Sequence, residues 1–275
     1  GNIFGKMGNL DYNLRPLWDA LLDIYVEFAK VCNKYNLKHY VTGGTAIGAL
    51  RHKGFIPWDD DFDVIMPRPD YIKFMEVYSQ ELPNHYRAMD FRNTSNYPYD
   101  FGKVCDMRKD VVKRVSDESN LLLGQGIFID VIPIDGMPKA TIPFYIWQIS
   151  RMAWRRAGQI KSEKLAMRPF WWIMSRILRV PRQSENARRM AFEKWLSKYD
   201  FYSSPAAEDF NASPRRRLAR AFTPATYGTP KMVSFESIEV PVVQDTDFFM
   251  NVIFGNWREL PPEEKRVPEH QVKNN

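Results

Sequence analysis

The segment from residue 38 to residue 67 restricts the fold of this chain most, because its pattern changes repeatedly within a short stretch. KHYVT (38–42) predicts a short buried strand, and GGTAIGALRHKG (43–54) predicts a glycine turn that opens a short helix ending at Gly54. FDVIMP (62–67) predicts a second strand that ends at Pro67. Strands and helices that alternate at this spacing favour an α/β (α+β) fold with a sheet flanked by helices.

Aspartates are concentrated at the start of the second predicted strand, in the run WDDDFDV. Because side chains alternate along a strand, Asp61 and Asp63 are expected to project from one face, while Phe62 and Val64 face the core. Two carboxylates on one face suit a hard divalent cation, Mg²⁺ or Mn²⁺, which removes their mutual repulsion. Asp61 and Asp63 are therefore predicted as metal ligands and catalytic residues. For Asp59, a role in binding the donor and simple solvation at the strand's start both remain open.

A third carboxylate, Asp130, lies within IFIDVIP (127–133), a run that is otherwise apolar. The whole segment 126–136 predicts a strand, rich in β-branched residues, that is ended by Pro133 and Gly136. A carboxylate buried without a partner is costly. A metal shared with Asp61 and Asp63 would supply that partner, so Asp130 is predicted as the third metal ligand.

The glycine turn before the short helix is predicted to bind phosphate. Gly43 and Gly44 let the backbone approach a ligand closely, the helix N-terminus presents unpaired N–H groups, and Thr45 adds a hydroxyl. Basic side chains are the expected partners of the anionic parts of a substrate. Those predicted to bind substrate are Arg51, His52 and Lys53, which end the short helix, and Lys103 in FGKVCDM.

The remaining pattern predicts three segments: an α/β core over 1–140, a helical basic and aromatic segment over 141–200, and a loop with a C-terminal region over 201–275 that packs back on the core. SSPAAEDFNASPRRR (203–217) is predicted as a loop from its composition. The other predicted elements are helices over 14–37, 68–82 and 184–199, and strands over 86–91, 101–107 and 111–115.

The charge and the cysteine content limit the expected binding partners and the expected cellular compartment. The net charge of +6 favours a polyanionic partner. Cys32 and Cys105, the two cysteines, lie in apolar patterns without a C-x-x-C pair, which favours a reducing compartment. No signal-like apolar segment and no run of 18 apolar residues is visible, so the expected location is cytoplasmic, either free or peripheral at the inner face of the membrane.

GGTAIGALRHKGFIPWDDDFDVIMPRPDYIKF resembles the signature of the LicD family, the phosphorylcholine transferases of bacterial surface glycans, to which fukutin and fukutin-related protein are similar. The resemblance continues in FGKVCDMR, in GIFIDVIPIDG and in GNWRELPPEEKRVPEH. It implies a nucleotidyltransferase-type fold and transfer of a phospho-substituent, phosphocholine or an alditol phosphate, from a CDP-linked donor to a sugar hydroxyl. By the same resemblance, Gly44 and Thr45 match the family's glycine turn, and Asp61 and Asp63 match its metal pair. Asp130 matches its third carboxylate, which is also a candidate base.

Other interpretations of the sequence remain open. A nucleotidyltransferase that attaches NMP to a small molecule or protein would use the same fold. A nucleic-acid-binding module is disfavoured, because no RNA or DNA motif accompanies the positive charge. The basic and aromatic helices of 144–182 suit either contact with an anionic membrane, where a glycan or lipid-linked glycan acceptor would be met, or plain packing on the core.

Overall fold

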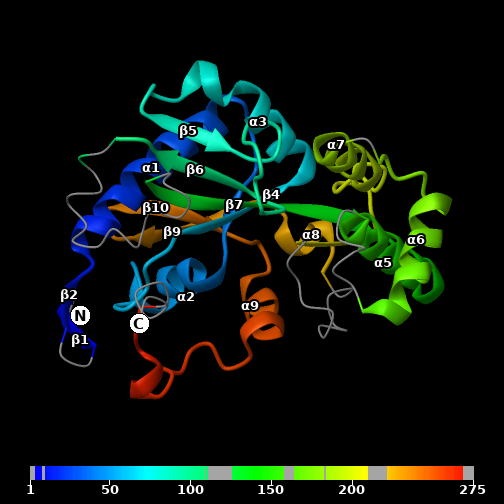
Figure 1. Cartoon of the computed structure of the whole chain (residues 1–275). Helices are drawn as coiled ribbons and strands as arrows, with labels where there is room; N and C mark the ends of the chain where they lie inside the picture. The colour runs from blue at the N-terminus through cyan, green and yellow to red at the C-terminus, as the bar shows by residue number, and fades with distance from the viewer. Residues whose placement is uncertain are drawn as a thin grey trace. The chain divides into compact units, whose positions relative to one another are not determined.

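The computed structural model describes residues 4–7, 10–108, 110, 126–157, 164–182, 184–209 and 222–268. It has a mixed α/β fold around a six-stranded sheet in the order β3-β4-β7-β6-β5, with β8 paired to β7, so the predicted fold class is confirmed (Figure 1). The sheet strands are β3 (Tyr40–Val41), β4 (Asp63–Pro67), β5 (Tyr86–Met89), β6 (Gly102–Asp106), β7 (Ile127–Met137) and β8 (Ala206–Asp209). Two hairpins, β1 (Phe4–Met7) with β2 (Leu10–Asn13) and β9 (Lys231–Phe235) with β10 (Ile238–Val242), complete the strands of the described residues.

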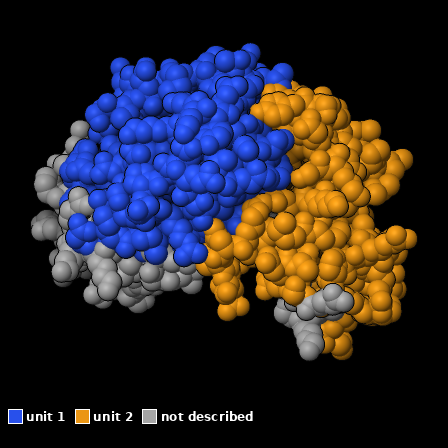
Figure 2. All heavy atoms as spheres, turned by 90° about the horizontal axis from the view of Figure 1, so that it is seen from above, with its two compact units in different colours: residues 1–90, 100–133, 225–275 blue, residues 91–99, 134–224 orange. Residues whose placement is uncertain are grey.

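The chain divides into two compact units, shown in Figure 2. Unit 1 comprises residues 1–90, 100–133 and 225–275, and unit 2 comprises residues 91–99 and 134–224. The C-terminal residues thus share unit 1 with the N-terminal part of the chain. The three segments expected from the sequence, 1–140, 141–200 and 201–275, stay a prediction.

Unit 1 contains helices from both ends of the chain. They include α1 (Arg15–Lys34), α2 (Gly43–His52), α3 (Arg68–Glu81) and α9 (Thr246–Phe254). In α1, Leu17, Leu21, Ile24 and Phe28 recur at helical spacing and are all buried, which is why this sequence forms an amphipathic helix. Figure 1 shows α3 and α2 on opposite sides of the sheet.

The ends of β4 and β7 differ from the prediction. β4 begins at Asp63, so Asp61 and Phe62 precede the strand rather than lie in it. β7 does not end at Pro133 or Gly136 but continues to Met137. Its pairing with β6 ends at Val131 and its pairing with β8 begins at Ile134, so Pro133, which has no N–H, falls between the two ladders.

Unit 2 consists of helices, one strand pair and the loop 91–99. The helices are α5 (Thr141–Arg156), α6 (Arg168–Ile177) and α7 (Glu185–Leu196), together with the short 3₁₀ helix η4 (Leu165–Met167). Met137, Phe144, Trp147, Leu196 and Ala206 form its buried core. The loop predicted over 203–217 is wrong at Ala206–Asp209, because pairing with the end of β7 makes these residues a strand. The predicted strand at 111–115 lies outside the described residues.

The remaining short elements are α8 (Pro224–Tyr227) and the 3₁₀ helix η6 (Glu263–Lys265). None of the described helices combines the length and the apolar character needed to span a bilayer.

Candidate active site

The N-terminus of α2 packs directly against the start of β4. The Thr42 amide donates to the Asp63 carbonyl at 3.1 Å, and the Asp63 amide donates to Thr45 Oγ1 at 3.0 Å. Gly43 has a φ of +59°, and a Cβ there would lie 3.0 Å from Asp63 Oδ2. The predicted glycine turn and the predicted aspartates therefore form one structural unit, with Thr45 fixing the backbone of Asp63.

Asp59, whose role the sequence left open, lies against the same turn. A Cβ on Gly44 would meet Asp59 Oδ2 at 2.5 Å, so a larger residue at position 44 would force this carboxylate to move. Asp59 Oδ2 is buried and has no hydrogen-bond partner among the described residues. Burial, followed by the negative charge of Asp61, raises the pKa of the Asp59 carboxyl well above its usual range. A buried carboxylate oxygen of this kind is suited to bind a cation.

The carboxylates of Asp59, Asp60 and Asp61 each place an oxygen within 4.8 Å of the others, close enough to share one ion. Oxygen ligands from carboxylates are those that Mg²⁺ and Mn²⁺ prefer. The acidic cluster therefore fits a hard divalent cation. The metal set predicted from the sequence, Asp61, Asp63 and Asp130, shares Asp61 with this cluster and stays a prediction.

Asp130 reaches the same region from β7. Its amide donates to the carbonyl of Phe62 at 3.0 Å, which places it beside the segment that carries Asp61 and Asp63. Asp130 stands opposite Lys103 in the β6–β7 ladder, and the two side chains form an ion pair. Lys103 is only 3% exposed and lies 3.7 Å from the centroid of the Phe128 ring. Lys103, a side chain predicted to bind substrate, thus supplies a charged partner for the half-buried Asp130 carboxylate.

Arg51, His52 and Lys53 lie at the other end of α2 from the glycine turn, and the helix is 10 residues long. At 1.5 Å per residue, this end is roughly 13 Å from the turn. Arg51 donates to the carbonyls of Trp257 and Glu259 at 2.8 and 2.9 Å, which favours a role in holding the C-terminal segment. Burial, with Arg51 beside it, lowers the pKa of His52, and Lys53 is the exposed C-cap of the helix. Their predicted contact with substrate stays a prediction.

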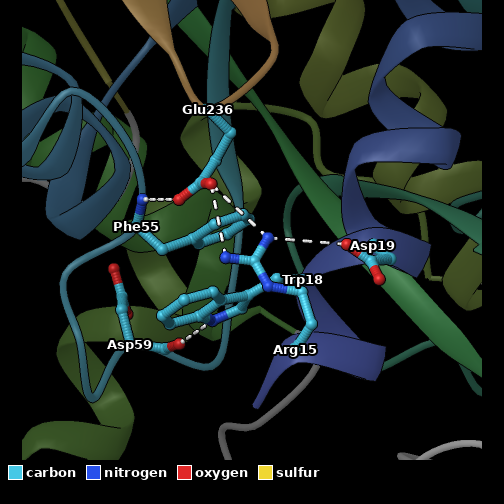
Figure 3. Close-up of polar contacts among 6 residues, drawn as sticks. All are labelled: Arg15, Trp18, Asp19, Phe55, Asp59 and Glu236. Carbon is cyan, nitrogen blue, oxygen red and sulfur yellow. Dashed lines mark hydrogen bonds and ion pairs between the residues drawn. The ribbon is translucent and has the colours of Figure 1, made fainter. Parts of the chain in front are cut away.

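The loop that carries Asp59 is fastened by residues far away in the sequence (Figure 3). The indole N–H of Trp18, in α1, donates to the Asp59 carbonyl at 2.7 Å, and the same ring stacks on Phe55 at 4.9 Å. Glu236 Oε1, in the turn between β9 and β10, accepts from the Phe55 amide at 3.3 Å. Glu236 Oε2 also lies 3.4 Å from Arg15. Sequence reasoning missed Trp18 and Glu236, because no local pattern marks contacts across such separations.

Replacing Glu236 by alanine is expected to destabilise the protein by about 1–3 kcal/mol, because the Phe55 amide loses its acceptor. The loop that carries Asp59 should also lose order, so the activity proposed below should fall. Glu236→Gln keeps a carbonyl oxygen at this position and should retain most of the stability and most of the activity. Urea unfolding of the wild-type protein and the two variants measures the change in the free energy of unfolding. Equal losses of stability in the two variants would show that the ion pair with Arg15, and not the contact with the Phe55 amide, stabilises the loop.

The sequence of this chain is similar to those of known proteins. Residues 36–135 match the family model described as LicD/FKTN/FKRP, nucleotidyltransferase domain, and this range contains the glycine turn, the aspartates, Lys103 and Asp130. Over 270 residues, the chain is 26% identical to the lipopolysaccharide cholinephosphotransferase LicD of Haemophilus influenzae, covering 94% of this chain and 96% of that protein. An uncharacterized protein of Rickettsia typhi is 34% identical over 68 residues, which are 25% of this chain and 22% of that protein. The resemblance to the LicD family predicted from the sequence is thus confirmed, by the family model over residues 36–135 and by the similarity to the Haemophilus protein along most of the chain.

Proposed function

We propose that this chain is a phosphotransferase that moves phosphocholine, or a closely related phospho-substituent, from a CDP-linked donor to a sugar hydroxyl of a surface glycan. The observation that carries the proposal is the similarity, along nearly its whole length, to a protein named as a lipopolysaccharide cholinephosphotransferase. The acidic cluster beside the glycine turn supports it, because a candidate cation site next to a helix N-terminus suits a diphosphate.

The donor's diphosphate would bind at the N-terminus of α2, with Gly43 and Gly44 allowing close approach. Asp61, Asp63 and Asp130, joined by the buried carboxylate of Asp59, would hold Mg²⁺ or Mn²⁺. Such an ion offsets negative charge that develops on the phosphorus oxygens and on the leaving nucleotide.

Asp130 is the candidate base for the acceptor. The sugar hydroxyl would give its proton to the Asp130 carboxylate while its oxygen attacks the phosphorus that carries choline. The bond from that phosphorus to the CMP oxygen breaks, and CMP leaves with the bonding electron pair. Lys103, paired with Asp130, would lie close to the negative charge of the phosphates.

The product distinguishes this reaction from nucleotidyl transfer. Incubation with CDP-choline and a lipopolysaccharide or oligosaccharide acceptor should release CMP and leave phosphocholine on the acceptor, as measured by chromatography and mass spectrometry. A panel with CDP-ethanolamine and CDP-ribitol would identify the preferred substituent. Release of phosphocholine with CMP left on the acceptor would instead establish the nucleotidyltransferase alternative.

Removing divalent cations with EDTA should abolish transfer, and Mg²⁺ or Mn²⁺ should restore it. A second measurement does not depend on activity: the cation should raise the Tm of the wild-type protein, as expected for any ligand that binds the folded state. Asp61→Asn should lose this shift, whereas Asp247→Asn, a substitution at an exposed side chain of α9, should keep it. Full transfer in EDTA would contradict the metal assignment.

We also propose that the reaction takes place in the cytoplasm. Cys32 and Cys105 are buried free thiols, the state expected in a reducing compartment.

A further inference from the structure

The exposed large apolar side chains of the described residues are concentrated in one part of unit 2. Most of them belong to α5, η4 and α6, and each of these is between 36% and 77% exposed. They are Ile142, Tyr145, Ile146, Ile149, Met152, Leu165, Met167, Phe170, Trp172, Ile173 and Ile177. Single exposed apolar side chains are ordinary, but a large contiguous patch indicates a site of contact with another molecule or with a membrane.

α5 is apolar on two faces. One face, which includes Phe144, Trp147 and Trp154, is buried in unit 2. The other carries the exposed side chains of residues 142, 145, 146, 149 and 152. At 100° per residue, these five positions form a stripe about 120° wide, which is the geometry of a helix that lies along an apolar surface. Packing within unit 2 accounts for the first face and leaves the second facing outward.

α6 continues this surface, and it packs beside α5 (Figure 1). Trp171 and Ser175 are buried, whereas Phe170, Ile173 and Ile177 recur at i, i+3 and i+7 and are exposed. Trp172 is also exposed, with the guanidinium groups of Arg176 and Arg182 at 5.2 and 5.8 Å from its ring centroid. Tryptophan beside arginine is the pair of side chains favoured at the boundary between lipid and water.

Every charged side chain of the described residues in this part of unit 2 is basic. Across 141–157 and 164–182 they are Arg151, Arg155, Arg156, Lys164, Arg168, Arg176, Arg179 and Arg182. A second copy of the chain on this surface would bring two sets of positive charge together, which is unfavourable. An anionic lipid surface supplies both the apolar phase and the opposite charge that this composition requires.

We propose that the exposed face of α5 and α6 docks on the surface of an anionic phospholipid bilayer, with the apolar side chains entering the boundary of the acyl chains and the basic side chains contacting the headgroups. The proposal goes beyond the transfer reaction: it states where the protein is held, and it rests on side chains of unit 2 that take no part in the candidate active site. Its failure would leave the proposed transfer reaction untouched.

Vesicle co-sedimentation tests the proposal with the full chain and without donor or acceptor. Binding to vesicles of phosphatidylcholine with 30% phosphatidylglycerol should be at least about 10-fold stronger than binding to phosphatidylcholine alone at 50 mM salt, and should weaken clearly at 500 mM salt. Quenching of tryptophan fluorescence by brominated lipids should accompany binding, because Trp172 would enter the boundary region.

Two variants on the proposed face, Ile146→Glu and Ile173→Glu, should each lower binding to the anionic vesicles about 10-fold or more. Met232→Glu is the matched control, because Met232 is 54% exposed but lies on β9 in unit 1. Unchanged Tm values would show that the variants fold. Equal binding to anionic and neutral vesicles, or equal losses in all three variants, would overturn the proposal. A monomer–dimer equilibrium in gel filtration that only Ile146→Glu and Ile173→Glu abolish, without an effect on vesicle binding, would overturn it in favour of a second copy.

Discussion

Asp63→Asn is expected to reduce phosphocholine transfer by about 10³-fold, which corresponds to roughly 4 kcal/mol of lost transition-state stabilisation. Asparagine keeps the shape of the side chain but removes the negative charge that a divalent cation needs, so the fold should not change. The Asp63 amide would still donate to Thr45 Oγ1, since this contact involves the backbone. Steady-state kinetics at saturating Mg²⁺ measures the loss of transfer activity, and a Tm measurement shows whether the fold is unchanged.

Asp61→Asn and Asp130→Asn should lose activity to a similar extent if these residues act as proposed. Asp19→Asn serves as a control for the loss of one carboxylate near the loop, because Asp19 is largely exposed and contacts Arg15 within α1. Wild-type activity of Asp63→Asn would remove the metal pair from the mechanism. Loss of activity only in Asp130→Asn, with Mg²⁺ stabilisation intact, would leave Asp130 as the base and exclude it from the metal ligands.

Gly48→Ala is expected to lower activity by about 10²-fold and to destabilise the protein by about 1–3 kcal/mol. A Cβ at position 48 would clash with the backbone carbonyl of Gly54 and lie 3.2 Å from the Ile56 amide nitrogen. These are backbone atoms of the segment that leads to Asp59, so the added methyl group has to displace this segment or α2. A displacement of about 1 Å at the aspartates is enough for the expected loss of rate.

Ile47→Ala, at the neighbouring position of the same helix, provides the comparison, because Ile47 is half-buried and its truncation adds no atom. It should lose some stability and keep most of its rate. Denaturant unfolding and initial rates separate the two effects. If Gly48→Ala were as stable and as active as the wild-type protein, the close packing of α2 on the loop would not be what positions Asp59.

The sequence predicted those parts of the fold and the site that depend on local patterns. α1 and α3 follow from apolar periodicity. The turn at the start of α2 follows from the two consecutive glycines, Gly43 and Gly44, because glycine is typical of turns. The burial of Phe62 and Val64, both 0% exposed, follows from strand alternation even though β4 begins only at Asp63. At each of these positions, the pattern of neighbouring residues was sufficient to predict the structure.

What the sequence did not predict depends on tertiary contact. β8 forms because Ala206–Asp209 meets the end of β7, and composition alone made this segment a loop. The role of Asp59 could not be assigned from the sequence, because its burial depends on tertiary contacts. Gly44 lies beside its carboxylate, and the Trp18 indole donates to its carbonyl. Lys103 and Asp130 were each predicted to bind something else, and their pairing became visible only in the register of β6 and β7.

The β9–β10 hairpin has a consequence for synthesis of the chain on the ribosome. Its residue Phe235 packs on Phe55 and Phe62 at 4.9 and 5.6 Å, and Glu236 holds the loop beside them. Unit 1 therefore needs residues from both ends of the chain, with residues 134–224 translated in between. At about 5–20 residues per second, that interval lasts roughly 5–20 s, during which Phe55 and Phe62 lack their contacts with Phe235. The nascent chain should depend on a chaperone during this period, and pulse-chase proteolysis should show residues 1–133 becoming resistant only after residue 242 has left the exit tunnel.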